Sequence, residues 1–261
     1  MERQIISVTD IITYLYCPRK LYLRLVKKVK TPPNKAMVSG FLKHKIFDIF
    51  NKNESILVSN IKENPTEQNI TELYQQYSER ISKEIFSNYS NAIKSFCINE
   101  EDLLKETLSF LDKDIKLRAK AIKKTLDLGY RGKDLWRNLK PKYLTEFELT
   151  SKILGLKGRI DRVKFGEEIE PYEIKTRENI FEEDKVQLAA YSLLLEEEFG
   201  KRIGRGIIEV KDREEEIEIT EELKNRVLEI AEKIRHMENA EFQNNFKKCK
   251  SCDLRKECFE F

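Results

Sequence analysis

Apolar residues recur at helical spacing through the first fifty residues and predict three helices there. Ser7-Val-Thr-Asp10 is typical of a capping box, and apolar residues follow it at intervals of three and four. Pro18 should end the first helix and begin the second, because the residue before a proline is driven out of the α region. After Pro32-Pro33, a third helix is expected from residue 36 to about residue 50.

A second helical pattern fills residues 67–128, and the texture changes near Tyr143, where apolar and polar residues begin to alternate as in strands. Strands are expected over residues 144–149, 156–165 and 169–176, with turns near 152–155 and 166–168. Residues 181–199 should be helical. Residues 204–210 and 215–219 predict a hairpin that turns at 211–214, and residues 221–237 predict a last helix before a cysteine-bearing tail.

Length and composition are those of a globular protein. A chain of 261 residues suffices for one large domain or for a core with an insertion. It has no run of about 18 apolar residues that would predict a transmembrane helix. The charged start MERQIISVTD lacks the pattern of a signal peptide, so we expect a cytoplasmic protein.

The net charge of +3 does not by itself indicate a nucleic-acid-binding protein. The distribution of charge is more informative, because basic residues are dense from Lys113 to Lys142, whereas acidic residues gather at 167–170, 196–198 and 214–216. Such runs usually form solvated surface. The alternative is that the basic stretch contacts phosphates, and DNA affinity would then fall as the salt concentration rises.

Two carboxylates and a lysine follow the predicted strands. Asp161 lies on the second strand, and Glu173 and Lys175 lie on the third. Residues i and i+2 of a strand point to the same face, so Glu173 and Lys175 should project together, and Asp161 can join them if the strands pair. Carboxylate oxygens hold Mg²⁺ or Mn²⁺, and a nearby lysine can orient the attacking water. The trio predicts metal-dependent hydrolysis of a phosphodiester.

The alternative interpretation of the trio is ordinary exposed strand charges. Glu-x-Lys alone is uninformative in a chain with 36% charged residues, and Glu183-Asp-Lys185 and Glu222-Leu-Lys224 also match it within predicted helices. Glu173-Ile-Lys175 differs because it lies on a strand and follows an aspartate on the preceding strand. Gly158 on that strand also allows close backbone approach.

Three further side chains are candidates for the same site. Gln187 and Tyr191 lie one turn apart on one face of the next helix, although a tyrosine there is more simply explained by packing. His44, in Gly40-x3-His44, is one of two histidines. A lone histidine is more often structural, but a metal held by carboxylates could accept its imidazole.

Closely spaced cysteines predict a metal or cluster site. Cys249-x2-Cys252-x5-Cys258 supplies three ligands from the tail, and Cys17, at the bend between two predicted helices, is the best candidate for a fourth. Their number suits zinc or an iron–sulfur cluster equally well. Cys97, in the helical stretch, is expected to be a small buried hydrophobe.

Together these residues resemble the CRISPR-associated RecB-like exonucleases, a family of PD-(D/E)xK nucleases that act beside spacer-integration proteins. The resemblance rests on Cys17-Pro-Arg-Lys, Gly40-x3-His44, Gly158-Arg-Ile-Asp161, Glu173-Ile-Lys175, Gln187-x3-Tyr191 and the tail cysteines. It implies an α/β fold, with a restriction-endonuclease-like PD-(D/E)xK core, a helical insertion and an iron–sulfur cap held by four cysteines. The stretch from about 52 to 140 is longer than in compact members, which leaves open a sister subfamily or a virus- or helicase-associated relative.

The resemblance also implies individual roles. Cys17, Cys249, Cys252 and Cys258 would hold a 4Fe–4S cluster. His44, Asp161, Glu173 and the Ile174 carbonyl would bind Mn²⁺ or Mg²⁺, with Lys175 completing catalysis. Gln187 and Tyr191 would position DNA. Because they lie near the site, Arg159 and Arg162 are expected to contact phosphates.

The resulting prediction is a DNA exonuclease that trims single-stranded ends of spacer precursors for the integration proteins. The alternatives are a non-catalytic iron–sulfur accessory subunit that binds DNA and a zinc-stabilised nuclease. We expect N-terminal helices over residues 1–51, a helical insertion over 52–140, the nuclease core over 141–240 and the cysteine tail over 241–261.

Overall fold

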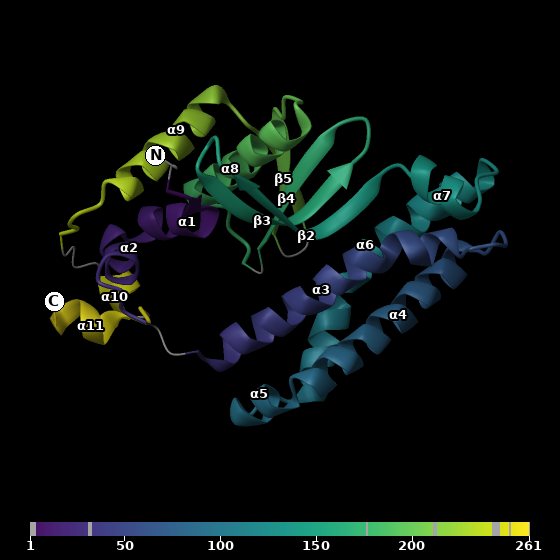
Figure 1. The fold of residues 1–261 in the computed structure, drawn as a ribbon, viewed down its shortest axis with the longest axis horizontal. Helices are drawn as coiled ribbons and strands as arrows, with labels where there is room; N and C mark the ends of the chain where they lie inside the picture. The colour runs from purple at the N-terminus through teal and green to yellow at the C-terminus, as the bar shows by residue number, and fades with distance from the viewer. Residues whose placement is uncertain are drawn as a thin grey trace. The chain divides into compact units, whose positions relative to one another are not determined.

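A computed structural model describes residues 4–30, 33–175, 177–210, 213–241, 246–250 and 252–260 (Figure 1). The chain divides into two compact units. The first, here called the sheet unit, contains Met1–Pro32, Phe147–Val163 and Glu170–Phe261, and the second, the helical unit, contains Pro33–Glu146 and Lys164–Ile169. Within the described ranges, no helix combines the length and the apolar character needed to cross a membrane.

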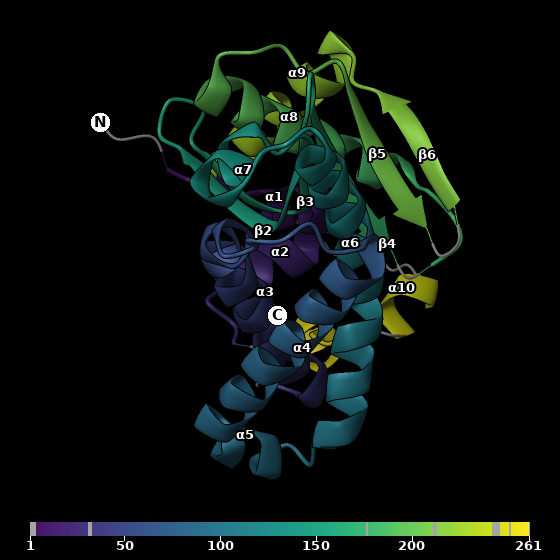
Figure 2. The ribbon, with the colours of Figure 1, turned by 90° about the vertical axis from the view of Figure 1, so that its right-hand side faces the viewer.

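A six-stranded sheet forms the centre of a mixed α/β fold. Its strands are β1 (Ile6–Ser7), β2 (Lys142–Ser151), β3 (Leu156–Phe165), β4 (Ile169–Lys175), β5 (Arg205–Val210) and β6 (Arg213–Glu218). They follow the order β1-β3-β4-β5-β6, with β2 on β3. β1 is parallel to β3, and β4 is parallel to β5. β5 and β6 are antiparallel neighbours, and Figure 2 shows them side by side.

The predicted strands are confirmed, and the strand predicted over 156–165 has the predicted bounds. β1 was not predicted, because two residues carry no alternation. Val210 pairs with Arg213, so the hairpin turn is tighter than expected, and its residues 211–212 lie outside the described part of the chain. Residue 176, the expected end of the third strand, also lies outside it.

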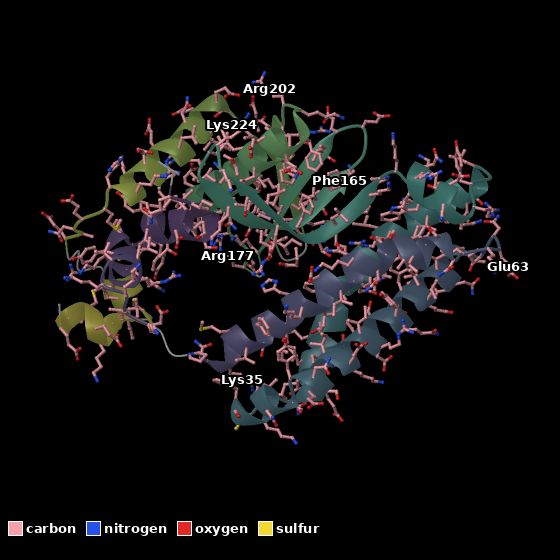
Figure 3. All side chains as sticks on the ribbon, in the orientation of Figure 1. Lys35, Glu63, Phe165, Arg177, Arg202 and Lys224 are labelled. Carbon is pink, nitrogen blue, oxygen red and sulfur yellow. The ribbon has the colours of Figure 1, made fainter. Side chains whose placement is uncertain are left out.

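The helices of the sheet unit include α1 (Val8–Tyr16), α2 (Pro18–Leu25), α8 (Glu182–Phe199), α9 (Glu221–Arg235), α10 (Phe246–Lys250) and α11 (Arg255–Glu260). The predicted capping box is present, since the Asp10 N–H donates to Ser7 Oγ at 3.0 Å and the Ser7 N–H donates to the Asp10 carboxylate at 3.3 Å. Helix α8 packs on α1, α9 and β5. Lys224 is buried and joins α9 to α8 by donating to Glu196 at 2.8 Å (Figure 3).

Gly158 lets α1 and α8 pack closely on β3. A Cβ atom at this position would lie 2.9 Å from Val8 Cγ2 and 3.0 Å from Leu194 Cδ1. Contacts this short cannot be accommodated without moving neighbouring atoms. The close approach predicted from this glycine is therefore confirmed, and it fixes the strand that carries Asp161.

The helical unit consists mainly of α3 (Lys35–Ser59), α4 (Glu67–Asn88), α5 (Ser90–Ser95), α6 (Glu100–Asp127) and α7 (Gly132–Asn138). Their apolar side chains, among them Ile46, Ile81 and Ile122, form one core. Helix α3 runs unbroken through residue 51, where an N-terminal segment was expected to end, so His44 belongs to the helical unit. Helix α7 was not predicted, because its seven residues are too few to show a period.

Two expectations for the helical stretch are wrong. Arg118 was counted among the basic residues that would contact phosphates, but it is 2% exposed and pairs with the equally buried Glu54. The Tyr74 hydroxyl donates to the same carboxylate at 2.9 Å, so this charge serves the core. Cys97 was expected to be buried, but it is exposed, because the chain turns out of α5 there with a φ of +50°.

We predict that Gly158→Ala lowers the free energy of unfolding by about 1–3 kcal/mol, because the methyl group overpacks the contact between β3 and the helices. Denaturant unfolding measures the change. Gly204→Ala is the control, since no heavy atom lies within 4 Å of a Cβ there, and it should unfold at the wild-type denaturant concentration. Equal stability of the two variants would contradict the close packing at Gly158.

Candidate active site

Glu173 and Lys175 project from the same face of β4, as their spacing predicted. The Lys175 Nζ atom lies 2.6 Å from Glu173 Oε1. Glu173 is buried, with 3% of its surface exposed, whereas the Lys175 side chain is 20% exposed. The carboxylate of this ion pair is therefore enclosed in the protein, whereas the lysine is accessible to solvent.

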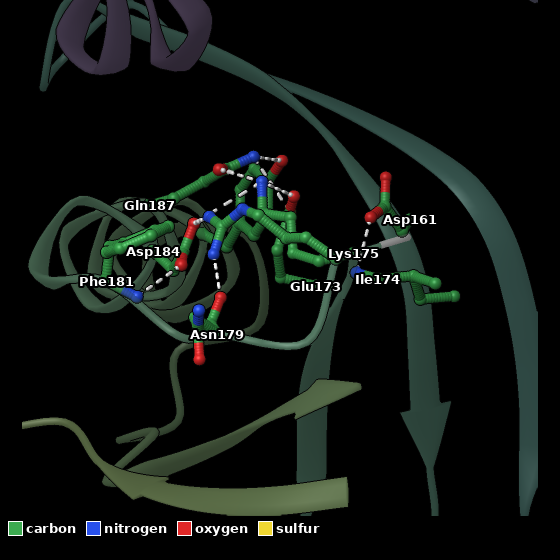
Figure 4. Close-up of polar contacts among 10 residues, drawn as sticks. Asp161, Glu173, Ile174, Lys175, Asn179, Phe181, Asp184 and Gln187 are labelled. Carbon is green, nitrogen blue, oxygen red and sulfur yellow. Dashed lines mark hydrogen bonds and ion pairs between the residues drawn. The ribbon is translucent and has the colours of Figure 1, made fainter. Parts of the chain in front are cut away.

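Asp161 reaches β4 from β3. Its Oδ2 atom accepts a hydrogen bond of 2.7 Å from the backbone N–H of Ile174, the residue between Glu173 and Lys175 (Figure 4). The two strands are joined by only three residues, and the Gly166 N–H donates to the Glu168 carbonyl across this turn. The pairing that would bring Asp161 to the other two residues is therefore present.

Gln187 connects the carboxylate and the lysine to α8. Its amide nitrogen donates to Glu173 Oε2 and to the Tyr191 hydroxyl, both at 2.8 Å, and its amide oxygen accepts from Lys175 Nζ at 3.1 Å. Tyr191 is 3% exposed. Both side chains thus contact protein groups, and Tyr191 is enclosed in the protein.

Burial governs the electrostatics of this cluster. Desolvation raises the pKa of Glu173, and the charge of Lys175 opposes that rise. Desolvation also raises the pKa of Tyr191 well above its usual value, helped by the negative charge of Glu173. Glu173 therefore needs its lysine and amide partners to remain ionised.

Two residues of the cluster, Arg177 and Asp184, were not predicted from the sequence. Asp184 is 1% exposed, and its Oδ1 atom lies 2.5 Å from Arg177 Nη2 and 3.6 Å from Lys175 Nζ. Its Oδ2 atom accepts from the Phe181 N–H at 2.8 Å, which caps the start of α8. An aspartate in the first turn of a predicted helix signals a cap, but nothing in the sequence signals its contact with Lys175.

Of the two arginines expected to contact phosphates, Arg162 requires a correction. It is 2% exposed, pairs with Glu209 at 2.8 Å and lies over the Tyr172 ring, so it is enclosed in the core. The error arose because Arg162 lies on the same face of β3 as the buried Ile160, whereas Arg159 lies on the opposite, more exposed face. The Arg159 side chain is 41% exposed and lies 3.5 Å from Glu148, so its contact with DNA stays a prediction.

In the helical unit, His44 lies beside a carboxylate that sequence analysis did not select. His44 Nδ1 is 2.6 Å from Glu146 Oε2, at an angle outside that of an ordinary hydrogen bond. The Glu146 side chain is 6% exposed and the His44 side chain 35% exposed, so the carboxylate is the more deeply placed partner. Such a carboxylate can orient an imidazole and leave its other nitrogen for a metal ion.

The four predicted cluster cysteines line one cavity of about 30 Å³ in the sheet unit, and none of them is in a disulfide. The list is Cys17, Cys249, Cys252 and Cys258. Burial raises the pKa of the Cys258 thiol, and the neighbouring Arg19 opposes the rise. Four thiols that line one space fit either an iron–sulfur cluster or zinc by donor chemistry.

The carboxylates fit a divalent cation by donor chemistry as well. Asp161 and Glu173 are hard oxygen donors on adjacent strands, and the Ile174 carbonyl lies in the backbone between Glu173 and Lys175. Among the described residues, however, no three His, Cys, Asp or Glu side chains already stand in the arrangement of a metal site. Lys175 and the Ile174 N–H satisfy the carboxylate oxygens instead.

The chain is similar to known proteins. The chain is similar to the CRISPR-associated exonuclease Cas4/endonuclease Cas1 fusion of Leptospira interrogans serogroup Icterohaemorrhagiae serovar Lai (strain 56601), at 31% identity over an alignment of 153 residues. The match covers 51% of this chain and 28% of that protein. The crystal structure of SSO0001, at 19% identity and a TM-score of 0.31, aligns with 84% of this chain and 94% of its own. The PD-(D/E)XK nuclease superfamily matches residues 5–259. The chain therefore belongs to the PD-(D/E)XK nuclease superfamily.

Proposed function

We propose that this protein is a Mn²⁺- or Mg²⁺-dependent deoxyribonuclease that acts as an exonuclease on single-stranded DNA ends. The observation that carries the proposal is the hydrogen bond from the Ile174 N–H to Asp161, which holds Asp161 beside Glu173 and Lys175. These are the residue types that metal-dependent phosphodiester hydrolysis requires. Membership in the nuclease superfamily supports the same reaction.

In this proposal, Asp161, Glu173 and the Ile174 carbonyl hold the cation. A bound Mn²⁺ or Mg²⁺ polarises the phosphodiester and favours hydroxide at neutral pH. Lys175 orients the attacking water and offsets charge that develops on the phosphate. Gln187 fixes the positions of the Lys175 and Glu173 side chains relative to each other, because its amide group bonds to both. The expected role of His44 as a further ligand, oriented by Glu146, stays a prediction.

The cysteines are proposed to hold a 4Fe–4S cluster that ties the tail to the first helices. Cys17 caps α2, where its Sγ atom accepts the Lys20 N–H at 3.4 Å, and the other three lie in or beside α10 and α11. A cluster at this position would reinforce the ion pair of 2.5 Å by which Lys20 of α2 already holds Asp253 of the tail. Zinc is the alternative occupant.

The biological role is proposed from the relative whose name includes a CRISPR-associated exonuclease and an endonuclease, Cas4 and Cas1. By this analogy, and by the resemblance of its motifs to the CRISPR-associated RecB-like exonucleases, the protein would trim spacer precursors and act with the proteins that integrate them. Single-stranded DNA ends and the integration proteins are then its partners.

We predict that Asp161→Ala and Lys175→Ala each lower the rate of single-stranded DNA degradation at least about 100-fold in Mn²⁺, because each removes a group that acts on the phosphate. End-labelled DNA gives the rate and the polarity. Lys185→Ala is the matched control, since Lys185 also follows a Glu-x-Lys pattern but lies on α8 and pairs with Glu182. It should cleave normally.

A wild type that binds DNA but never cuts it, with either cation and with single or double strands, would contradict the nuclease proposal. That result would favour a DNA-binding accessory subunit. Activity that survives in Lys175→Ala would instead remove the lysine from the mechanism.

We predict that Glu173→Gln raises the midpoint of thermal unfolding in EDTA while it abolishes cleavage. Burial raises the pKa of Glu173, so its ionised form costs the folded chain stability. This loss of stability is complete above the pKa of Glu173 in the folded chain and absent below its pKa in the unfolded chain. Relative to Glu173→Gln, the wild type should therefore lose stability as the pH rises from the lower of these two pKa values to the higher.

Glu182→Gln is the control for this measurement. Lys185 lowers the pKa of the exposed Glu182, so the charge there does not penalise the folded chain, and its removal should not raise the midpoint. A lower midpoint for Glu173→Gln than for the wild type would show that the ionised carboxylate stabilises the fold.

We predict that protein purified without oxygen is brown, with broad visible absorbance that dithionite bleaches, and that Cys17→Ser loses this colour because it removes one thiolate ligand. Cys97→Ser is the control, since Cys97 is exposed and lies in the helical unit. Metal analysis completes the test. A colourless protein with one zinc ion per chain would replace the iron–sulfur proposal with a zinc site.

A further inference from the structure

The segment between β4 and α8 carries an arginine stacked on an exposed aromatic ring. The Arg177 guanidinium carbon lies 4.4 Å from the centroid of the Phe181 ring. Phe181 is 46% exposed, and the Arg177 side chain is 35% exposed. Figure 3 labels Arg177, and Figure 4 labels Asn179, Phe181 and Asp184, the three residues that Arg177 contacts.

Arg177 and Lys175 are held by the same atom. Both contact Asp184 Oδ1, at 2.5 Å and 3.6 Å respectively, so their nitrogens can lie no farther apart than the sum of these distances. A second cation therefore stands next to the lysine that we assign to catalysis. Asp184 is buried and fixed by the Phe181 N–H, which makes it a rigid anchor for both cations.

A purely structural role does not account for all of this geometry. The Asp184 carboxylate caps α8 through its other oxygen, so the cap does not require Arg177. The arginine uses Nη2 for Asp184 and Nη1 for the Asn179 carbonyl. A guanidinium has five N–H donors, and within the described part of the chain these two contacts leave three of them available.

The available N–H donors of Arg177 suit a phosphate group, because the planar guanidinium can bond to two phosphate oxygens at once. The exposed Phe181 ring suits a nucleobase, since aromatic side chains stack on bases of single strands whatever their sequence. A strand that places one phosphate at Lys175 would bring a neighbouring phosphate toward Arg177. The arginine and the ring thus match two groups that recur along one DNA strand.

We propose that Arg177 and Phe181 form a DNA-binding subsite beside the nuclease site, in which Arg177 binds a phosphate next to the one that is cut and Phe181 stacks on an adjacent base. Asp184 is the positioning residue that aims Arg177 at the phosphate. The subsite rests on the proposed function, because it needs a DNA strand at Lys175.

Binding without cleavage tests the subsite. The measurement is the fluorescence anisotropy of a labelled single-stranded oligonucleotide with full-length protein in Ca²⁺, over a range of salt concentrations. Arg177→Ala should weaken binding about tenfold and lower the slope of log affinity against log salt by about 1, because one phosphate contact is lost. Arg177→Lys should restore the slope and part of the affinity, since it keeps the charge and loses the fork.

Arg202→Ala is the matched control, because Arg202 is an exposed arginine of the same unit that pairs with Glu221. It should keep wild-type affinity and slope. Phe181→Ala should weaken binding of the normal strand but not of a strand with abasic residues, where no base is available to stack. A salt slope that is unchanged in Arg177→Ala, in a protein that unfolds at the wild-type temperature, overturns the phosphate contact.

The same proteins assayed in Mn²⁺ separate the two proposals. If the wild type cuts DNA, and Arg177→Ala binds and cuts it as well as the wild type does, the proposed subsite is wrong. The proposed nuclease function is then unaffected. A wild type that binds in Ca²⁺ through Arg177 but never cuts in Mn²⁺ refutes the proposed function. In that case Arg177 still binds a phosphate, but the phosphate at Lys175 is not one that this protein cuts.

Discussion

The contact on which the site depends is the hydrogen bond from the Ile174 N–H to Asp161. It joins the aspartate of β3 to the backbone of β4 at the residue whose neighbours are Glu173 and Lys175. This donor holds the Asp161 carboxylate against β4, the strand that carries the second acidic group, Glu173. Gly158 supports the same arrangement, because its missing side chain lets α1 and α8 lie close enough to hold β3 in place.

Buried charge explains why the cluster is so fully connected. Glu173 and Asp184 are both nearly inaccessible, and an isolated carboxylate in such a place would be too costly to remain ionised. Lys175 lies between them, and Gln187 donates to Glu173 while it accepts from the lysine. In the structure, Lys175 and Gln187 thus offset the buried charge of Glu173.

Elements and motifs with a short sequence period could be predicted, whereas contacts between distant elements could not. Alternation located β3 and β4, and the two-residue spacing placed Glu173 and Lys175 on one face. The same spacing puts Arg162 on the face of β3 that also carries the buried Ile160, so its expected contact with phosphates was wrong. Asp184 resembled an ordinary cap, because its second oxygen, which contacts Arg177 and Lys175, belongs to no local pattern.

Glu146, in the helical unit, has a strained backbone conformation that its neighbours hold in place. Its φ of +54° is an unfavourable backbone conformation for a residue with a side chain, at a cost of about 1–3 kcal/mol, and such strain persists only where neighbouring groups enforce it. Here Asn51 of α3 enforces it, since its amide bonds to the backbone and hydroxyl of Thr145, the residue before Glu146. Asn51 is itself contacted by Arg118 from the buried ion pair of α6 and α3. The buried ion pair of the core is therefore connected, through Asn51 and Thr145, to the residue whose carboxylate lies beside His44.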